Sequence, residues 1–458
     1  MQRFVVLLYG KTGGIMNTPI YDFMCRYSNS DILRFHMPGH KGSSPEPLLD
    51  MLYKLDITEI KGADSLFEAD GIIAESEKNA SKLFNTAGTF YSVGGSTLCI
   101  QTMLALMKRE GRTVIAARNV HRAFLNAAAL LDLDVHWLYL KYSGGILTGE
   151  IPLDELEKEL MECKAPTCVY ITSPDYTGKT ADIEKISSIC RKYNSPLLVD
   201  NAHGPHLAFF EKSRHPIARG ADLCCDSAHK MLPALTGAAY LHISDLKYAD
   251  KVKDAMTLFA STSPSYLIMA SLDLCNRYID EKIREDIKNI QQRVEKLRAK
   301  LSARLVFADS EPFHITINAA ESGFDGKEFA DLLRAENVEC EYADSLYTVL
   351  LTSPFEAVEK LDNLETALKT TVNRAKRTRY VYKDFSVPKL KRAMSIRNAV
   401  FSTSETLNVE NSEGRVCSAV NVPCPPAIPI AVSGEVINKE CIDVFLRYGI
   451  RNVNVVKE

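Results

Sequence analysis

The sequence predicts an α/β protein whose main part is a mostly parallel sheet covered by helices on both faces. Short apolar segments typical of buried strands recur from residue 112 onward, and amphipathic helical segments separate most of them. Alternation of this kind is typical of parallel sheets with helices on both sides. With 458 residues, the chain is also long enough for two or three domains.

The strand prediction rests on a set of short apolar segments. They are 112–117, 134–140, 167–173, 196–200, 221–226 and 237–244, and helical patterns at 153–163 and 181–193 lie among them. A long charged helical stretch from Ser263 to about Ala303 follows, and strand-like segments at 312–319 and 346–353 come after it. We therefore expect an N-terminal segment at 1–45, a major domain with a connector helix at 46–300, and a smaller α+β domain at 301–458.

Composition excludes several classes of function. The formal net charge is -3 and the pI is about 6.4, so nothing favours nucleic acid or an anionic membrane surface as a partner. The apolar run at 4–9 is too short to span a membrane and lacks the pattern of a secretion signal. The twelve cysteines include no CxxC pair, which favours buried thiols over a disulfide framework or a zinc ribbon. We expect a cytoplasmic protein that acts on a small molecule.

The first candidate site is the stretch SVGGST at 92–97. Gly94 and Gly95 permit a close approach of the backbone to a ligand, and Ser96 and Thr97 place hydroxyls at the start of a helical segment. Free N–H groups at a helix start form a phosphate site. A capped helix without any ligand explains the same residues.

The second candidate is Asp200, which ends a buried strand segment. A carboxylate there could cap a helix, be a satisfied core acid or hold a charged partner. Metal binding is the rival chemistry, because DxxH and HxxxH spacings occur among Asp200, His203, His206, His36 and His40. Pro38 and Gly39 lie between His36 and His40, so these two histidines cannot share one face of a regular helix. We expect no metal site.

His121 and Lys230 complete the pattern. His121 follows a strand segment, where its flat ring could stack on a flat ligand. Lys230 lies in DSAHKMLPALTG between strand-like segments, where a partly desolvated amine is a nucleophile suited to Schiff-base formation. Either residue alone is explained equally well by a structural role. Together with the helix start and Asp200, they supply the contacts that pyridoxal 5'-phosphate requires for its phosphate, ring nitrogen, ring face and aldehyde.

The order and spacing of these motifs resemble the Orn/Lys/Arg decarboxylases. The segments that carry the resemblance are RFHMPGHKG (34–42), DITEIKGADSLFEADGII (56–73), SVGGST (92–97), NVHRA (119–123), DNAHGPH (200–206), DSAHKMLPALTG (226–237), STSPSY (261–266) and CPPAIPIAVSGE (424–435). The chain is most similar to the short bacterial branch, whose members lack an N-terminal receiver-like wing. The resemblance implies the aspartate aminotransferase-like fold of type I pyridoxal-phosphate enzymes, with a mostly parallel seven-stranded sheet and a smaller α+β C-terminal domain.

The resemblance also implies a role for each matching residue. Lys230 would form the imine with the cofactor, Asp200 would pair with the pyridine nitrogen, and His121 would stack on the ring. The remaining implied contacts are Ser96, Thr97, Ser227 and His229 around the phosphate, His203 beside the cofactor, and Thr262 reaching the phosphate of the neighbouring subunit. The role of Thr262 implies a homodimer with its active site at the subunit interface, and larger even-numbered assemblies occur in the family. Lys230 and His229 are both candidates for returning a proton to Cα.

The implied reaction is the decarboxylation of a basic L-amino acid. Arginine, giving agmatine in polyamine biosynthesis, is the first choice, and lysine and ornithine are the alternatives. The distal cation of such a substrate requires an anion, for which Asp64 in the acidic stretch 56–70 and Glu435 are candidates. Two other functions stay open: an aminotransferase or β-eliminating enzyme of the same fold, and a cofactor-binding paralogue without turnover. The intact set of Lys230, Asp200 and His121 argues against the paralogue.

Two parts of the chain depart from the family pattern. Cys424 and Ala427 interrupt a motif that is usually close to YPPGIP, so the substrate wall there is expected to differ. The opening residues have no counterpart in the family, which makes Met16 a candidate start. They include Gly10-Lys11-Thr12, but this is not a Walker loop, because Val5 stands where such a loop needs glycine.

Overall fold

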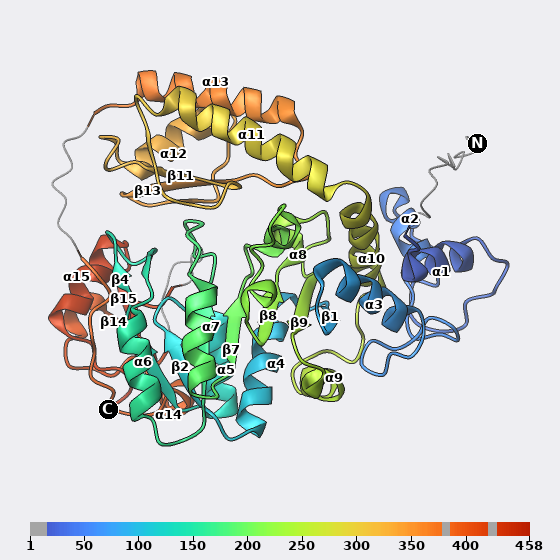
Figure 1. Ribbon diagram of the computed structural model, residues 1–458, viewed down its shortest axis with the longest axis horizontal. Helices are drawn as coiled ribbons and strands as arrows, with labels where there is room; N and C mark the ends of the chain where they lie inside the picture. The colour runs from blue at the N-terminus through green and yellow to red at the C-terminus, as the bar shows by residue number, and fades with distance from the viewer. Residues whose placement is uncertain (1–15, 378–384, 420–427) are drawn as a thin grey trace.

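A seven-stranded sheet forms the centre of the molecule (Figure 1). The computed structural model describes residues 16–377, 385–419 and 428–458. The strand order is β1-β9-β8-β7-β6-β2-β3, and only β9 runs antiparallel to its neighbours in this sheet. The strands are β1 (Gly88–Ser92), β2 (Thr113–Ala117), β3 (Val135–Leu138), β6 (Thr167–Thr172), β7 (Leu197–Asp200), β8 (Leu223–Asp226) and β9 (Ala239–Ile243). The predicted mostly parallel seven-stranded sheet is confirmed.

Helices cover both faces of this sheet. One layer contains α4 (Gly95–Arg109), α5 (Arg122–Leu131) and α9 (Ala249–Met256), and the other contains α6 (Leu153–Glu162) and α7 (Ile183–Lys192). Along β6, Cys168 and Tyr170 pack with the first layer, whereas Val169 and Ile171 pack with the second. Because successive side chains point to opposite covered faces, the strand reads as a continuous apolar run.

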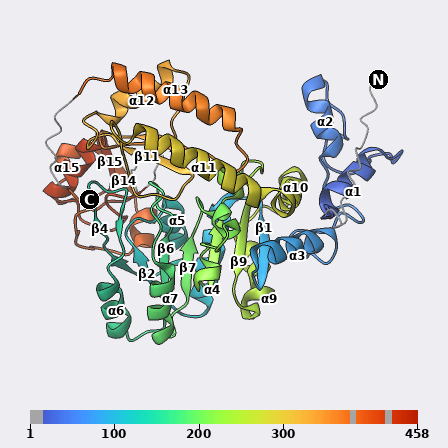
Figure 2. The same ribbon diagram turned by 45° about the horizontal axis from the view of Figure 1, so that its top comes forward.

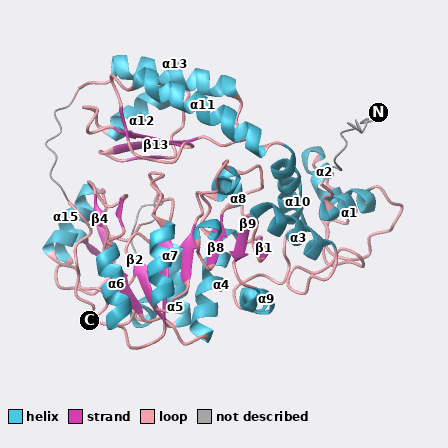
Figure 3. Ribbon diagram, viewed as in Figure 1, coloured by secondary structure: helices cyan, strands magenta, loops and turns pink. Residues whose placement is uncertain are grey.

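A smaller antiparallel sheet lies beside the ends of the large one (Figure 3). Its strands, in spatial order, are β10 (Val306–Phe307), β11 (His314–Asn318), β13 (Tyr347–Leu351) and β12 (Tyr342–Ala343), and its helices are α11 (Ile283–Leu301), α12 (Gly326–Ala335) and α13 (Val358–Arg374). Ile315 and Ile317 of β11 pack with these helices. By the alternation of a strand, His314 and Thr316 face the other way, toward the large sheet.

The remaining elements lie at the two ends of the molecule (Figures 1 and 2). At one end are α1 (Pro19–Ser28), α2 (Pro47–Leu55), α3 (Ile72–Phe84) and α10 (Tyr266–Glu281). The other end holds the hairpin of β4 (Lys141–Tyr142) and β5 (Gly149–Glu150), with β14 (Ser404–Asn408), α15 (Lys439–Arg447) and β15 (Asn452–Val456), while α14 (Ile396–Phe401) packs on α5. Within the described ranges, no helix combines the length and apolar character needed to cross a membrane.

Two elements illustrate where the structure differs from the sequence expectation. β1 was not predicted, because its sequence GTFYS is not a continuous apolar run; pairing with β9 along its full length makes it a strand. The helical stretch predicted from Ser263 is two helices, α10 and α11, separated at Lys282. The limits proposed for the three domains stay a prediction.

Candidate active site

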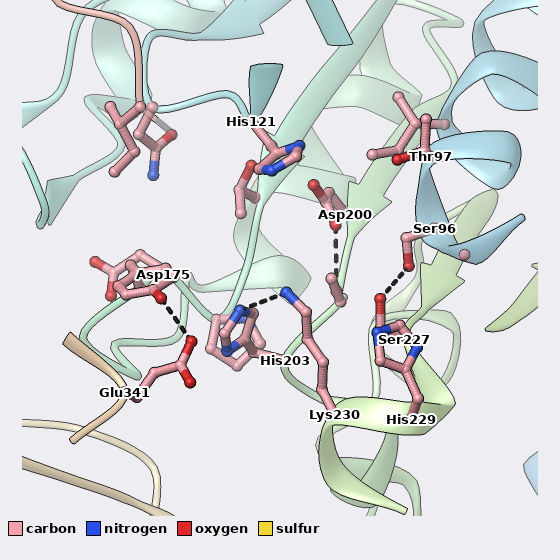
Figure 4. A pocket seen from close by; sticks show the side chains of 18 residues that line it. Ser96, Thr97, His121, Asp175, Asp200, His203, Ser227, His229, Lys230 and Glu341 are labelled. Atoms are coloured by element: carbon pink, nitrogen blue, oxygen red, sulfur yellow. Dashed lines mark hydrogen bonds between the residues drawn. The ribbon is translucent and has the colours of Figure 1, made fainter. Parts of the chain in front are cut away.

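A pocket of about 520 Å³ opens at the carboxyl ends of the parallel strands (Figure 4). This edge is where ligands bind in open α/β sheets. The side chains that line the pocket include these predicted residues: Ser96, Thr97, His121, Asp200, His203, Ser227, His229 and Lys230. The structure therefore brings together residues that the sequence distributes over more than a hundred positions.

The start of α4 forms one end of the pocket. Gly95 has a φ of +66°, a conformation that favours glycine, and its N–H donates to the carbonyl of Gly237 over 2.8 Å. No side chain caps this helix, and the hydroxyls of Ser96 and Ser227 lie 2.6 Å apart beside its first turn. An uncapped helix start next to two hydroxyls fits a phosphate group, which accepts hydrogen bonds from both.

Asp200 lies at the end of β7 and is buried. Its carboxylate accepts hydrogen bonds from the Tyr170 hydroxyl and the Ala202 N–H, both over 3.2 Å, and from the Cys225 thiol over 3.6 Å. All of these donors are neutral, and Asp200 makes no ion pair with any residue that the structure describes. A buried carboxylate of this kind fits a protonated ring nitrogen, because such a ligand supplies the positive charge that the protein does not.

His121 presents an uncharged ring to the same pocket. It is the N-cap of α5, and its Nδ1 accepts the N–H of Ala123 over 3.1 Å, so the proton of the neutral ring is on Nε2. Burial lowers the pKa of His121, and the positive charge of Lys230 lowers it further against the opposing effect of Asp200. A neutral flat ring in this position suits stacking on an aromatic ligand.

Lys230 belongs to the short helix α8 (Ala228–Met231), directly after β8. Its Nζ lies 2.9 Å from Nε2 of His203. The side chain of Lys230 is exposed to the pocket, while its contact with His203 is partly buried, so the expected partial desolvation of the amine stays a prediction. The strand-like segments on either side are β8 and β9, and α8 between them directs the amine out of the core. The neighbouring His229 donates from Nδ1 to the Ala238 carbonyl over 2.9 Å, and burial lowers its pKa.

Three predicted residues lie outside the pocket of their own chain. Thr262 is exposed in the loop before α10, and Asp64 and Glu435 are engaged with the protein itself. The Asp64 carboxylate accepts hydrogen bonds from the backbone N–H groups of Ser65, Asp70, Gly71, Ile73 and Ala74. Burial would raise the pKa of Asp64, but these donors outweigh it and lower the pKa.

Glu435 forms a buried ion pair with Arg118. Oε2 of Glu435 lies 3.1 Å from the guanidinium, and both side chains are almost completely enclosed. Arg118 also donates to the carbonyls of Pro429 and Ile430, so it ties the C-terminal segment to the end of β2. The structure thus gives Glu435 a structural partner within the chain.

The pocket also contains acidic and aromatic residues that the sequence did not single out. Glu341 and Tyr176 meet there, with the Tyr176 hydroxyl donating to Glu341 over 2.6 Å. Asp175 is buried beside them, where one of its oxygens holds the loop through Thr177 and Lys179. Burial raises the pKa of Asp175 despite these hydrogen bonds. Glu341, by contrast, is exposed at the pocket wall, so its carboxylate is open to a ligand.

The histidines weighed as metal ligands do not meet. His36 contacts the Tyr27 hydroxyl over 2.6 Å and His40 pairs with Asp56 over 3.1 Å, and neither lines the pocket. A different close group of metal-type ligands exists in the core: His215, Cys224 and Asp226. There His215 and His242 both bond to one oxygen of Asp226 over 3.1 Å, so hydrogen bonds account for the arrangement.

The fold and the pocket together define the class of protein. A helix start for a phosphate, a buried carboxylate for a ring nitrogen, a neutral ring and a lysine amine fit pyridoxal 5'-phosphate, and they stand at the correct edge of an α/β sheet. These are the features of a fold type I pyridoxal-phosphate enzyme.

Comparison with known proteins gives the family. The profile of the Orn/Lys/Arg decarboxylase major domain matches residues 18–320, and that of the C-terminal domain of the same family matches residues 375–450. The chain belongs to the Orn/Lys/Arg decarboxylase family. It is an amino acid decarboxylase, and its cofactor is pyridoxal 5'-phosphate.

Individual relatives resemble the chain over nearly their full length. The uncharacterized protein YaaO of Bacillus subtilis is 29% identical, and the match covers 94% of both chains. The arginine decarboxylase of Halalkalibacterium halodurans is 28% identical, with 92% of this chain and 91% of the relative covered. The crystal structure of the lysine decarboxylase LdcF of Francisella novicida has the same fold, with a TM-score of 0.79 at 16% identity, over 96% of this chain and 81% of the other.

Proposed function

We propose that the protein decarboxylates L-arginine to agmatine and carbon dioxide, as a step of polyamine biosynthesis. Lysine and ornithine are the second choices, because they share the basic side chain. The observation that carries the proposal is the position of Glu341. This exposed carboxylate lies in the pocket wall and bonds to the Tyr176 hydroxyl, and no cationic residue among those that the structure describes forms an ion pair with it.

The two ends of the pocket differ in charge in the way a basic amino acid requires. Ser96 and Ser227 lie on one side of Lys230, and Glu341 lies on the other, beyond His203 (Figure 4). A substrate whose amine reaches the cofactor aldehyde at Lys230 can therefore extend its side chain toward Glu341. A carboxylate on the far side of the pocket from the phosphate end supports a substrate with a distal positive charge.

Glu341 and Tyr176 favour a guanidinium over an ammonium. The Tyr176 hydroxyl binds Glu341 and leaves the other carboxylate oxygen for the substrate, while the tyrosine ring offers a flat surface beside it. A guanidinium is planar and stacks on aromatic rings, whereas an ammonium is a compact point charge. The relative named arginine decarboxylase, which matches nearly the full chain, supports the same choice.

The pocket also supports decarboxylation over transamination. Aminotransferases of this fold usually hold the substrate α-carboxylate with an arginine, and the described residues that line this pocket include none. Arg118 is close in sequence to His121 but is buried against Glu435. A carboxylate that is weakly held can leave as carbon dioxide.

The predicted cofactor residues of the pocket have the following roles in this proposal. Bound pyridoxal 5'-phosphate supplies an aldehyde for the amine and a protonated ring that takes up the electron pair of the broken Cα–carboxylate bond. Asp200 keeps the ring nitrogen protonated, His121 fixes the plane of the ring, and the start of α4 with Ser96, Thr97, Ser227 and His229 anchors the phosphate. Lys230 binds the aldehyde, and Lys230 or His229 holds the proton that returns to Cα.

The test is product analysis with the purified, cofactor-loaded protein. We would supply arginine, lysine and ornithine separately and measure carbon dioxide, the amine product and any keto acid. Agmatine and carbon dioxide in equal amounts, with arginine preferred, is the expected result. Carbon dioxide from none of these amino acids would refute the proposal, and a keto acid would favour an aminotransferase.

We also propose that the active unit is a homodimer. The amphipathic helix α2 has no buried residue, and its Leu48, Met51 and Leu52 are exposed together with Phe35 of the preceding loop. Thr262 is exposed as well, as a residue that reaches a second subunit must be. Light scattering should give twice the mass of the 51.0 kDa chain, and replacing Leu48 and Met51 by glutamate should reduce it to one chain. A monomeric wild-type protein would refute the proposal.

A further inference from the structure

A buried row of hydrogen bonds leads from Lys230 into the small sheet. Lys230 Nζ lies 2.9 Å from His203 Nε2, and His203 Nδ1 lies 3.3 Å from His314 Nε2. The row ends where His314 Nδ1 bonds to Oε1 of Glu311. The side chains of His314 and Glu311 are fully enclosed, so water does not compete for these bonds.

The fold builds this row from two separate parts of the chain. His203 follows β7 of the large sheet, whereas His314 begins β11 of the small sheet and faces away from the helices there. Gly178 lets the two parts approach: its φ is +88°, and a Cβ added to it would lie 2.4 Å from the Cβ of His314. The Glu311 N–H donates to the Gly178 carbonyl over 2.8 Å, which fixes the contact.

The far end of the row is a firmly held anion. The second oxygen of Glu311 lies 2.8 Å from Nε2 of His206 and accepts the N–H of Phe313 over 3.1 Å. Burial would raise the pKa of Glu311, but His206 and His314 outweigh burial and hold the pKa well below its usual range. Glu311 therefore carries a negative charge inside the protein.

That charge sets the direction of the first hydrogen bond in the row: an ionised Glu311 only accepts, so His314 donates to it from Nδ1. The proposed row has the neutral tautomer of His314, whose Nε2 is then an acceptor. His203 then donates from Nδ1 to His314, and its own Nε2 keeps a lone pair directed at Lys230. Burial, reinforced by the positive charge of Lys230, lowers the pKa of His203 well below its usual value, so this histidine is uncharged at rest.

We propose that Glu311 and His314 are positioning residues for the reaction: acting through His203, they hold a proton acceptor against the Lys230 nitrogen and stabilise positive charge there. The inference rests on the proposed role of Lys230 as the residue that binds the cofactor aldehyde. It adds two residues of the small sheet to the machinery, neither of which lines the pocket.

Other charged groups surround the row and bear on its pH dependence. His121, His229 and Asp200 face Lys230 from the large sheet, and Glu341 and Asp175 lie across the pocket. Arg298 of α11 donates to the carbonyl of His314 over 2.6 Å, and His206 faces Glu311. None of these groups is changed in the variants described next. A difference in pH midpoint between the variants therefore comes from the row of hydrogen bonds.

The experiment is a pH titration of the visible absorbance of the cofactor-loaded protein without any amino acid. The colour of the lysine-bound cofactor reports protonation of the lysine nitrogen. Glu311→Gln keeps the shape but removes the charge, so positive charge at that nitrogen is less stabilised. We expect the midpoint to fall by about one pH unit, which is about the contribution of a single hydrogen bond in a connected network.

His314→Leu breaks the row and leaves Glu311 in place, and we expect it to lower the midpoint by a similar amount. In the double variant the two shifts should not add, because both remove the same connection. Additive shifts would overturn the proposal, since they would mean that Glu311 acts directly through space. If Glu311→Gln fails to fold, His314→Leu alone decides: an unchanged midpoint refutes the row.

Glu365→Gln is the matched control. Glu365 is an almost fully buried carboxylate of α13 that pairs with Arg293, Lys300 and Lys369, away from the pocket. Its replacement removes the same charge and should leave the midpoint unchanged; an equal shift there would overturn the proposal. Because no amino acid is added, the titration succeeds or fails independently of whether arginine is the substrate.

Discussion

The amine of Lys230 lies 2.9 Å from Nε2 of His203, on the exposed side of a short helix that separates two buried strands. The lysine is thus kept out of the core by the fold and kept near a neutral base by its neighbours. If Lys230 binds the cofactor aldehyde as proposed, His203 is the neighbour that faces its nitrogen.

Lys230→Ala should abolish both the visible absorbance of the bound cofactor and decarboxylation. No other lysine lines the described part of the pocket, so no amine replaces it. We expect a loss of at least about a thousandfold in kcat/KM. Lys247→Ala, on the exposed short helix before α9, should behave as wild type. A surviving absorbance band in Lys230→Ala would contradict the assignment.

Asp200→Asn should reduce kcat while the protein still binds the cofactor. The amide oxygen can keep the hydrogen bond from Ala202, and the amide nitrogen can donate to the oxygen of the Tyr170 hydroxyl, but the group carries no charge for the ring nitrogen. We expect a loss of about a hundredfold or more in kcat, measured by carbon dioxide release at saturating cofactor. Retention of full activity would mean that the ring nitrogen does not depend on this carboxylate.

Glu341→Gln should weaken arginine turnover selectively. A hydrogen bond to a charged group contributes about 1.5–3 kcal/mol, so kcat/KM for arginine should fall about tenfold to a hundredfold with cofactor binding unchanged. Glu339→Gln is the control: Glu339 stands two positions earlier but pairs with Arg334 at the surface. Equal effects of the two substitutions would remove Glu341 from the substrate site.

Glu435→Gln should destabilise the protein without a specific effect on substrate binding. The substitution leaves the enclosed guanidinium of Arg118 without its counter-charge, which costs about 3–5 kcal/mol. The free energy of unfolding from urea titration measures this loss, and Glu339→Gln should change it by less than about 1 kcal/mol. A raised KM with unchanged stability would instead support the substrate role that the sequence suggested.

Asp273 should make stability rise as the pH falls toward 4. Burial raises the pKa of this carboxyl group to about 6, although the backbone N–H groups of Ile20 and Tyr21 and the Ser76 hydroxyl bond to it. The folded state therefore binds a proton between pH 6 and pH 4 that the unfolded state has released, so lowering the pH through this window favours folding.

Asp273→Asn imitates the protonated form and tests this sign. The variant should be more stable than wild type at neutral pH by about 3 kcal/mol and should lose the change between pH 6 and pH 4. Unfolding by urea at several pH values measures both effects. The difference in stability between wild type and Asp273→Asn is what decides. If both proteins lose stability equally from pH 6 to pH 4, the prediction is contradicted.

The sheet was predictable because its strands are covered on both faces. The central residues of segments such as 167–173 and 221–226 are apolar on both faces, and that pattern is visible without a structure. β1 was not predicted, because its residues are mixed in polarity and only the pairing with β9 makes it a strand. The pocket residues next to strand ends were predictable for the same reason, since Asp200 and Lys230 directly follow segments that were recognised.

The opposite wall of the pocket was not predictable. Glu341 enters it only because the small sheet packs across the ends of the large one, and the same packing brings His314 against His203. No local pattern encodes that contact. Glu435 was chosen as a substrate residue because it is an acid in a conspicuous motif. Its partner Arg118 is 317 positions away, and no local sequence pattern in either segment indicates the pairing.

The pairing of Arg118 with Glu435 also affects when this edge of the protein can fold during translation. The strand end that carries Arg118 leaves the ribosome long before Glu435 is translated, and until then a guanidinium destined for the interior has no counter-charge. Folding of this edge, and with it the placement of Ile428 in the pocket wall, must wait for that later segment. A nascent chain halted before Glu435 would accordingly be inactive and easily cleaved by proteases, even though every cofactor residue proposed for its own subunit had already been made.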